Sequence, residues 1–163
     1  MSNSKLDATD VRILSAVQEH GRLSKSALSE KVNLSATPSW TRLCRLEKDG
    51  LIRGYHADIA LDRIGDVTTV IVRVSLESHR EKDFKKFENR ILEVDEIVEC
   101  VATGGGFDYI MKFVTTNLAA FQELIEGLLA EEIGIERYFI YVVTREVKSS
   151  RPNLMRHFRK SGD

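Results

Sequence analysis

The sequence has few cysteines and no long apolar run, and both absences limit what the protein can be. Its two cysteines, Cys44 and Cys100, lack the close spacing that a metal site requires. A disulfide between them is not expected in a reducing compartment, so we expect two buried or half-buried thiols. No apolar run approaches the roughly 20 residues of a membrane helix, and the polar start MSNSKLDATD is unlike a signal peptide. We therefore expect a cytoplasmic protein without a membrane partner.

Motifs of the common enzyme classes are also missing. The four histidines, His20, His56, His79 and His157, lie in separate segments without the i, i+4 spacing of metal ligands. The sequence has no Ser-His-Asp order, no Walker-type loop and no Gly-x-Gly-x-x-Gly segment after a strand. We therefore predict a protein that is not an enzyme and that holds no metal and no cofactor.

The charges are unevenly distributed along the chain, although the net charge is only −1. Residues 1–60 hold nine Lys/Arg and seven Asp/Glu, residues 61–144 hold nine and sixteen, and residues 145–163 hold six and two. A polyanion is therefore expected to meet the ends of the sequence rather than its centre. Because phosphate contacts supply much of the affinity for DNA, we expect two or more copies of so weakly basic a chain to act together.

Residues 6–60 show the pattern of a winged helix-turn-helix. A first helix spans Asp7 to about His20, and a second is capped by Ser24. Residues 33–35 end the second helix, and Ser35 is placed to cap a third that begins near Ala36. A strand pattern flanked by glycines follows the third helix. The apolar residues Ile13, Leu14, Val17, Leu28 and Val32 recur at a spacing that closes a three-helix core.

The third helix carries an apolar stripe and a polar side that suits the major groove of DNA. Its stripe consists of Ala36, Trp40, Leu43 and Leu46. The residues that we predict to contact double-stranded DNA are Ser35, Thr37, Pro38, Ser39, Thr41, Arg42, Arg45 and Lys48. Short hydroxyls precede cations, as expected of a recognition helix whose first turns touch base edges. The periodicity alone is equally compatible with a solvated helix pair.

The same region resembles the N-terminal signature of the Lrp/AsnC (leucine-responsive regulatory protein) transcription regulators. The resemblance spans most of residues 6–59 and is carried by Leu6, Asp7, Asp10, Ile13, Leu14, Gly21, Arg22, Leu34, Ser35, Arg42, Arg45, Leu46, Glu47, Gly50, Leu51, Ile52, Gly54 and Tyr55. Cys44 departs from it, since a basic residue is frequent there. The resemblance implies a C-terminal domain that binds amino-acid effectors, and a homodimer through back-to-back sheets that assembles further into tetramers or octamers.

After a linker at residues 61–65, the patterns follow the order βαββαβ. The strands are expected at residues 67–76, 97–103, 109–114 and 135–147, and the helices at residues 78–94 and 117–130. This order is the ferredoxin-like plan, an antiparallel sheet with both helices on one face. We predict an α+β protein with a winged helix-turn-helix in residues 1–60, a ferredoxin-like effector and oligomerisation domain in residues 61–150 and a basic tail in residues 151–163. The tail is compatible with disorder, with a short helix packed on a neighbour, or with DNA contact.

The second face of this sheet is predicted to bind another copy of the chain. Strand residues alternate between the two faces, so Val70, Val72 and Val74 or their neighbours remain for the face without helices. Both sets are largely apolar, and a bare apolar face of this size is usually covered by another subunit.

The glycine-rich segment TGGGFDY is the candidate effector site. Its backbone N–H groups can approach a carboxylate closely, and Asp108 can receive an ammonium, so together they suit a zwitterionic amino acid. It resembles the Gly-x-x-Asp loop of the same family, with Gly106 where an aspartate is more typical. The effector-binding residues that we predict are Gly104, Gly105, Gly106, Phe107, Asp108 and Tyr109. Asp108 is equally suited to capping the turn.

These patterns predict a sequence-specific DNA-binding transcription regulator whose oligomer responds to a small amino-acid-like effector. The alternative is an amino-acid-sensing or assembly module that does not bind DNA. The two hypotheses differ in whether the polar side of the third helix has a role in DNA binding.

Overall fold

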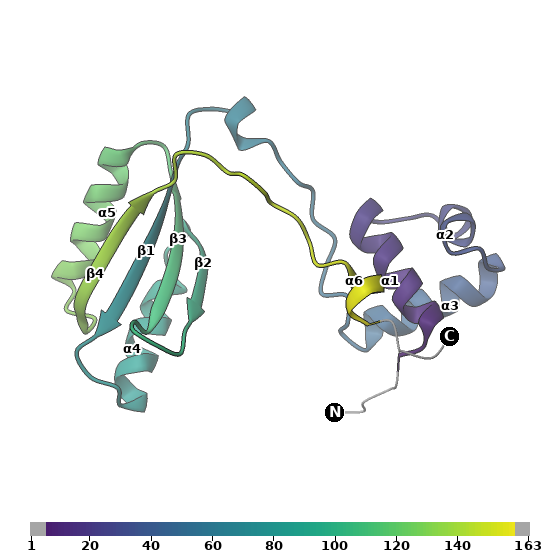
Figure 1. Cartoon of the computed structure of the whole chain (residues 1–163), viewed down its shortest axis with the longest axis horizontal. Coiled ribbons are helices and arrows are strands. Elements are labelled where there is room, and N and C mark those ends of the chain that lie inside the picture. The colour runs from purple at the N-terminus through teal and green to yellow at the C-terminus, as the bar shows by residue number, and fades with distance from the viewer. Residues whose placement is uncertain (1–5, 159–163) are drawn as a thin grey trace. The chain divides into compact units, whose positions relative to one another are not determined.

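The computed structural model describes residues 6–158, which divide into two compact units (Figure 1). The first unit, which we call the head, takes in the described residues up to Ile59 and those from Lys148 onward. The second, the sheet unit, comprises Ala60–Val147. The chain passes between the two units twice, and each unit has its own hydrophobic core.

Three helices form the head: α1 (Ala8–His20), α2 (Lys25–Val32) and α3 (Ala36–Lys48). α1 begins with a capping box, in which the Asp7 carboxylate accepts from Asp10 N–H at 2.8 Å and the Asp10 carboxylate accepts from Asp7 N–H at 3.2 Å. Ser24 caps α2 as predicted, and Asn33 ends it in the left-handed conformation. The residues buried between the helices are Ile13, Val17, Leu28, Val32, Leu43 and Leu46.

Two local predictions for the head are wrong. α3 begins at Ala36 as expected, but the Ser35 side chain makes no capping hydrogen bond, and the Ser35 carbonyl instead accepts from the N–H and the hydroxyl of Ser39. The strand pattern after α3 pairs with no other strand in the described part of the chain. A strand needs a neighbouring edge to bond with, and this segment has none within the head.

The described part of the basic tail belongs to the head. Its helix α6 (Leu154–His157) lies beside α1 (Figure 1). Arg151 Nη1 donates to the Gln18 carbonyl at 2.7 Å, and the Asn153 side chain caps α6 by accepting from Arg156 N–H. Of the alternatives for the tail, a short packed helix is what the structure contains, and it packs on the α1 of its own chain. The predicted disorder of the last residues concerns positions outside the described range.

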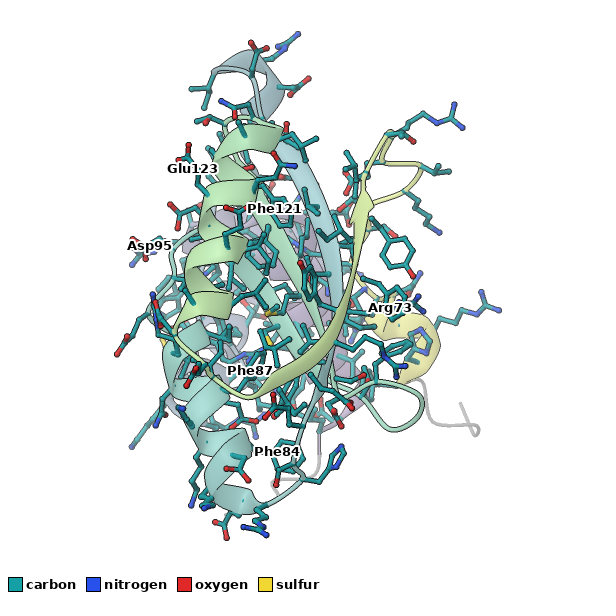
Figure 2. All side chains as sticks on the ribbon, turned by 90° about the vertical axis from the view of Figure 1, so that its left-hand side faces the viewer. Arg73, Phe84, Phe87, Asp95, Phe121 and Glu123 are labelled. Atoms are coloured by element: carbon teal, nitrogen blue, oxygen red, sulfur yellow. The ribbon has the colours of Figure 1, made fainter. Side chains whose placement is uncertain are left out.

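The sheet unit has the predicted ferredoxin-like architecture. A short 3-10 turn, η1 (Leu61–Arg63), precedes its six main elements. They are β1 (Thr68–Leu76), α4 (Glu81–Ile91), β2 (Ile97–Ala102), β3 (Tyr109–Thr115), α5 (Leu118–Ala130) and β4 (Ile135–Val142). The strands pair antiparallel in the order β2-β3-β1-β4, and both helices cover one face (Figures 1 and 2). Asn117 caps α5. β4 ends at Val142, earlier than the predicted Val147.

The core of the sheet unit settles which strand residues face the helices. Val70, Val72 and Val74 are fully buried and belong to the same cluster as Phe87 of α4 and Phe121 of α5. Their neighbours along β1 therefore lie on the other face, which we call the open face. By strand register, the open face carries Ile71, Arg73, Val101, Ile110, Lys112, Phe139 and Tyr141.

The cysteines, which are sparse in the sequence, are not where they were expected. Cys44 and Cys100 are both exposed in the single chain, so the prediction of buried or half-buried thiols is wrong. The reason is position, since Cys44 lies outside the apolar stripe of α3 and Cys100 lies on the edge strand β2.

None of the helices within residues 6–158 has the length and apolar character needed to cross a membrane.

Candidate functional site

The outward side of α3 combines small polar groups with the cation of Lys48, which forms no ion pair with any of residues 6–158. Thr37 and Pro38 of the first turn, Thr41 one turn later and Lys48 at the end are all exposed, as is Ser35 before the helix. The Thr41 hydroxyl donates to the Thr37 carbonyl at 3.0 Å, which fixes the direction of its methyl group. The first turns of this face therefore carry short side chains and its end carries a cation, which is the order expected of a helix that reads a DNA groove.

Ser39 does not belong to this face. Its side chain is fully buried, and its hydroxyl donates to the carbonyls of Ser35 and Ala36, each at 3.0 Å. The prediction that Ser39 points outward is therefore wrong. A serine hydroxyl that bonds to the preceding turn of its own helix can be buried without an unsatisfied polar atom, and this removes the cost that keeps most polar residues at the surface.

Arg42 and Arg45 are less free than the sequence suggested, because both form ion pairs with α1. Arg42 Nη1 lies 2.6 Å from Asp7 Oδ2 and 3.0 Å from Asp10 Oδ1, while Arg45 Nη2 lies 2.7 Å from Asp10 Oδ1. Hydrogen bonds to Asp7 and Asp10 raise the pKa of the Arg42 guanidinium. Both arginines therefore join α3 to α1, while their side chains stay 37% and 42% exposed.

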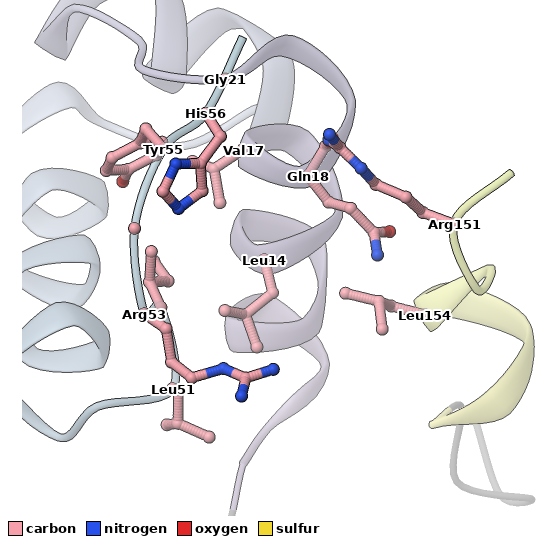
Figure 3. Close-up of a pocket in the computed structure, with 12 residues that line it drawn as sticks. Leu14, Val17, Gln18, Gly21, Leu51, Arg53, Tyr55, His56, Arg151 and Leu154 are labelled. Atoms are coloured by element: carbon pink, nitrogen blue, oxygen red, sulfur yellow. The ribbon is translucent and has the colours of Figure 1, made fainter. Parts of the chain in front are cut away.

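The head also contains an open groove of about 680 Å³ between α1, the segment after α3 and the tail (Figure 3). Apolar side chains of α1 and α6, including Leu14 and Leu154, face this groove together with the cations Arg53 and Arg151. Next to it, the Tyr55 hydroxyl donates to Glu47 at 2.8 Å, and burial together with this bond raises the pKa of Tyr55 to about 12. Tyr55 therefore fixes the segment after α3 to the helix itself.

The glycine loop, defined as residues 104–109, connects β2 to β3. Thr103 N–H donates to the Asp108 carbonyl at 2.8 Å, and the Thr103 hydroxyl donates to the Phe107 carbonyl at 2.5 Å. Gly105 has a φ of +147°, a conformation that side chains rarely adopt, whereas a Cβ at Gly104 or Gly106 would meet nothing within 4 Å. Glycine is therefore required by the backbone at Gly105 alone.

Besides the bond that its carbonyl accepts from Thr103 N–H, Asp108 makes three further hydrogen bonds. Its N–H donates to the Val74 carbonyl at 2.8 Å, and Oδ2 accepts from Leu76 N–H at 2.8 Å, where the pairing of β1 with β4 is irregular. Its other carboxylate oxygen, Oδ1, lies 3.0 Å from His79 Nε2. The capping role, one of the two alternatives for Asp108, is therefore what the hydrogen bonds show. Oδ1 lies on the side of the exposed His79.

Tyr109 completes the loop from inside the unit. It is buried against Phe87, with ring centroids 4.7 Å apart, and its hydroxyl donates to Glu88 at 2.7 Å. Burial and this bond raise the pKa of Tyr109.

Sequence reasoning missed the partners Asp7, Asp10, His79 and Glu88, because each pairs with a residue distant in the sequence or in a different element. Only the Asp7/Asp10 capping box had a local signal, in its i, i+3 spacing. Within residues 6–158, no three His, Cys, Asp or Glu side chains come together as a metal site.

The two units match two known families of domains. Residues 6–53 match the family described as winged helix-turn-helix DNA-binding, and residues 69–153 match the Lrp/AsnC ligand binding domain. The fold and these matches define a class of protein, a transcription regulator with one DNA-binding and one ligand-binding domain. The chain belongs to the Lrp/AsnC family.

Individual relatives agree with this assignment. The chain is 44% identical over 144 residues to the transcriptional regulatory protein DoeX of Halomonas elongata, covering 88% of this chain and 91% of DoeX. It is 36% identical over 148 residues to the leucine-responsive regulatory protein of Haemophilus influenzae, covering 91% and 89%. A transcriptional regulator of Neisseria meningitidis, solved as a complex with L-methionine, superimposes with a TM-score of 0.84 at 30% identity over 94% and 99% of the two chains. These relatives are transcription regulators, which favours the DNA-binding hypothesis over a module without DNA binding.

Proposed function

We propose that residues 1–60 bind double-stranded DNA through α3 and that residues 61–150 bind an amino-acid-like effector and self-associate. The observation that carries the DNA assignment is the exposed series Thr37, Pro38 and Thr41 followed by Lys48 on α3. Ser35 lies at the start of the same surface. We assign base contacts to the first turns and phosphate contact to Lys48. Arg45, whose side chain is 42% exposed, retains donors for a phosphate while it pairs with Asp10.

A DNA-binding measurement on matched lysine variants tests this assignment. DNA sequences selected by the full-length protein from a random pool serve as the probe, and fluorescence anisotropy is recorded at several salt concentrations. Lys48→Ala is expected to weaken binding and to lower the salt slope by about one for each phosphate that the protein no longer neutralises. Lys85→Ala is the control, since Lys85 pairs with Glu81 on α4 of the sheet unit. Equal binding curves for Lys48→Ala and the wild type would remove α3 as the DNA-reading helix.

The glycine loop is the proposed effector site. Backbone N–H groups of residues 104–106 are not shielded by side chains, and the Oδ1 atom of Asp108 faces an exposed histidine that a ligand ammonium can replace. The L-methionine complex of the Neisseria relative supports an amino acid as the class of ligand. Phe107 and Tyr109 flank the loop and set the shape that it presents. We propose no catalytic activity.

The open face supports self-association. Its exposed apolar side chains include Val101, Phe139 and Tyr141, which are 43%, 48% and 43% exposed in the single chain. Exposed apolar side chains on a sheet face are stabilised when another copy covers them. We propose a homodimer that assembles further into a tetramer or octamer, and an effector that favours one assembly by binding it more tightly.

A thermal-shift screen of the twenty amino acids, followed by light scattering, tests the effector proposal. A ligand that binds only the native state raises its melting temperature. At least one amino acid is expected to raise it and to change the oligomer mass measured with and without that amino acid. If all twenty leave both the melting temperature and the mass unchanged, the amino-acid effector proposal is wrong, while the DNA assignment stands on its own measurement.

A further inference from the structure

Arg73 is a cation in the middle of the open face. It lies on the central strand β1, where its cross-strand neighbours are Ile110 on β3 and Phe139 on β4. Figure 2 shows its side chain on the face turned away from the helices. The surrounding side chains are largely apolar, so the position of Arg73 has no explanation in the packing of the sheet unit alone.

Aromatic rings surround the Arg73 guanidinium. Its central carbon lies 4.6 Å from the ring centroid of Phe107, 4.7 Å from that of Tyr141 and 5.4 Å from that of Phe139. Phe107 belongs to the glycine loop, so Arg73 is in direct contact with the proposed effector site. The faces of the rings attract the positive charge, but they accept few hydrogen bonds from the guanidinium N–H groups. Within the described residues, the Nε atom is buried and has no hydrogen-bond partner.

A buried donor without a partner indicates a missing acceptor. The planar guanidinium fork matches a carboxylate, which accepts two parallel N–H bonds. The carboxylate of the loop, Asp108, accepts from Leu76 N–H and lies against His79, so it suits the ammonium of a ligand and not its carboxylate. Among the described residues that contact the loop, Arg73 is a cation with an unsatisfied donor.

We propose that Arg73 binds the carboxylate of the effector and makes the site selective for ligands that carry one. The proposal rests on the effector role of the glycine loop. Arg73 supplies the positive charge that the backbone N–H groups of the loop lack, and Phe107 stacks on the guanidinium and holds it beside the loop. A neutral amide of the same ligand offers only one acceptor oxygen and no charge, so it binds more weakly.

Pairs of ligands that differ only in the carboxylate isolate this interaction. The probes are L-methionine with L-methioninamide and L-leucine with L-leucinamide, measured by calorimetric titration on the full-length wild type, Arg73→Met and Arg73→Lys. Arg137→Met is the matched control, because Arg137 also lies over the Phe139 ring, at 5.8 Å. The ratio of acid to amide affinity is measured within each variant, so general damage to the site cancels.

The wild type and Arg137→Met are expected to bind the acid about tenfold or more tightly than the amide. In Arg73→Met this ratio is expected to fall to about one, chiefly through weaker binding of the acid, and Arg73→Lys is expected to lie between them. An unchanged ratio in Arg73→Met overturns the proposal. If the acid-to-amide ratio of Arg73→Met is unchanged and its oligomer mass is lower, the proposal is also overturned, since Arg73 would then contact a second copy of the chain. If none of the twenty amino acids binds the wild type, the effector function itself fails, which is a distinguishable result.

Discussion

Asp10 of α1 and Arg45 of α3 form an ion pair that is buried at one end, with Asp10 Oδ1 2.7 Å from Arg45 Nη2. The Asp10 side chain is 1% exposed, and Arg42 contacts the same oxygen at 3.0 Å. One buried carboxylate therefore connects α1 to two arginines of the helix that we assign to DNA. Both the stability of the head and the position of α3 therefore depend on this contact.

Removing both arginines is expected to destabilise the head far more than removing either. Arg42→Ala or Arg45→Ala leaves Asp10 with one cation and costs about 1 kcal/mol, whereas the double variant leaves a buried carboxylate without any and costs about 3–5 kcal/mol. Urea unfolding followed by the fluorescence of Trp40, the single tryptophan of the chain, measures both. Arg12→Ala, an exposed arginine of α1, is the control. Additive single effects would contradict the shared-carboxylate interpretation.

The same experiment decides how DNA-binding data on these arginines are interpreted. Arg42→Ala and Arg45→Ala are expected to weaken binding to selected DNA and to lower its salt dependence without changing the oligomer mass. DNA binding should be measured without urea, under conditions in which Trp40 fluorescence shows that the head is folded. Unchanged DNA affinity in both variants would restrict the arginines to joining the two helices.

Asp7 is expected to make the head sensitive to acid. Burial opposes its ionisation, but hydrogen bonds from Asp10 N–H and Arg42 outweigh that effect, and the pKa of Asp7 lies below its ordinary value of 3.8. A carboxyl with a lowered folded-state pKa stabilises the fold above its unfolded-state pKa, and this stability is lost as the pH falls through the folded-state value. The Trp40 urea midpoints of the wild type and Asp7→Asn should therefore differ at pH 7 and converge as the pH falls below 3.8 and through the folded-state pKa. A constant difference across this range would show that Asp7 acts without its charge.

The glycine loop is expected to tolerate alanine at one glycine and not at the next. Gly105→Ala places a side chain at a φ of +147° and is expected to cost about 1–3 kcal/mol. Gly106→Ala meets no atom within 4 Å and is the matched control, with an effect within about 0.5 kcal/mol. Scanning calorimetry of the full chain measures both. Equal melting temperatures would mean that the loop relaxes around Gly105 at little cost.

Asp108 is expected to show separate structural and ligand roles. Asp108→Asn keeps an oxygen that accepts from Leu76 N–H, whereas Asp108→Ala leaves that donor unsatisfied and costs about 1–3 kcal/mol. The ligand-free melting temperature should therefore fall clearly only in Asp108→Ala. The increase that an amino-acid effector produces should be lost in both, because neither retains the charge that receives an ammonium. A normal ligand response in Asp108→Asn would remove this carboxylate from the effector site.

Local chemistry explains why much of the fold was predictable. Ser24 and Asn117 cap the helices that they were expected to cap, and the order of apolar periods predicted the ferredoxin-like plan. Alternation along β1 separates two sets of residues but contains no information on which set the helices cover. Val70 and its neighbour Ile71 are equally apolar, so only the packed structure distinguishes them.

The site was less predictable because its key contacts join distant residues. Arg42 and Asp10 are 32 positions apart, and Asp108 is 29 from His79. A helical projection places both arginines and Ser39 on the polar side of α3, yet it contains neither the carboxylate behind the arginines nor the carbonyls that accept the Ser39 hydroxyl. The exposed hydroxyls, by contrast, depend only on the period of the helix.

The hydrogen bond between Arg151 and the carbonyl of Gln18 has a consequence for how the chain joins its two units. Because the residues after β4 end on α1, while the residues before β1 continue from α3, the head is tethered at two separate points. A single proteolytic cut in either connecting segment would therefore leave the two units joined through the other, as long as α6 stays packed on α1.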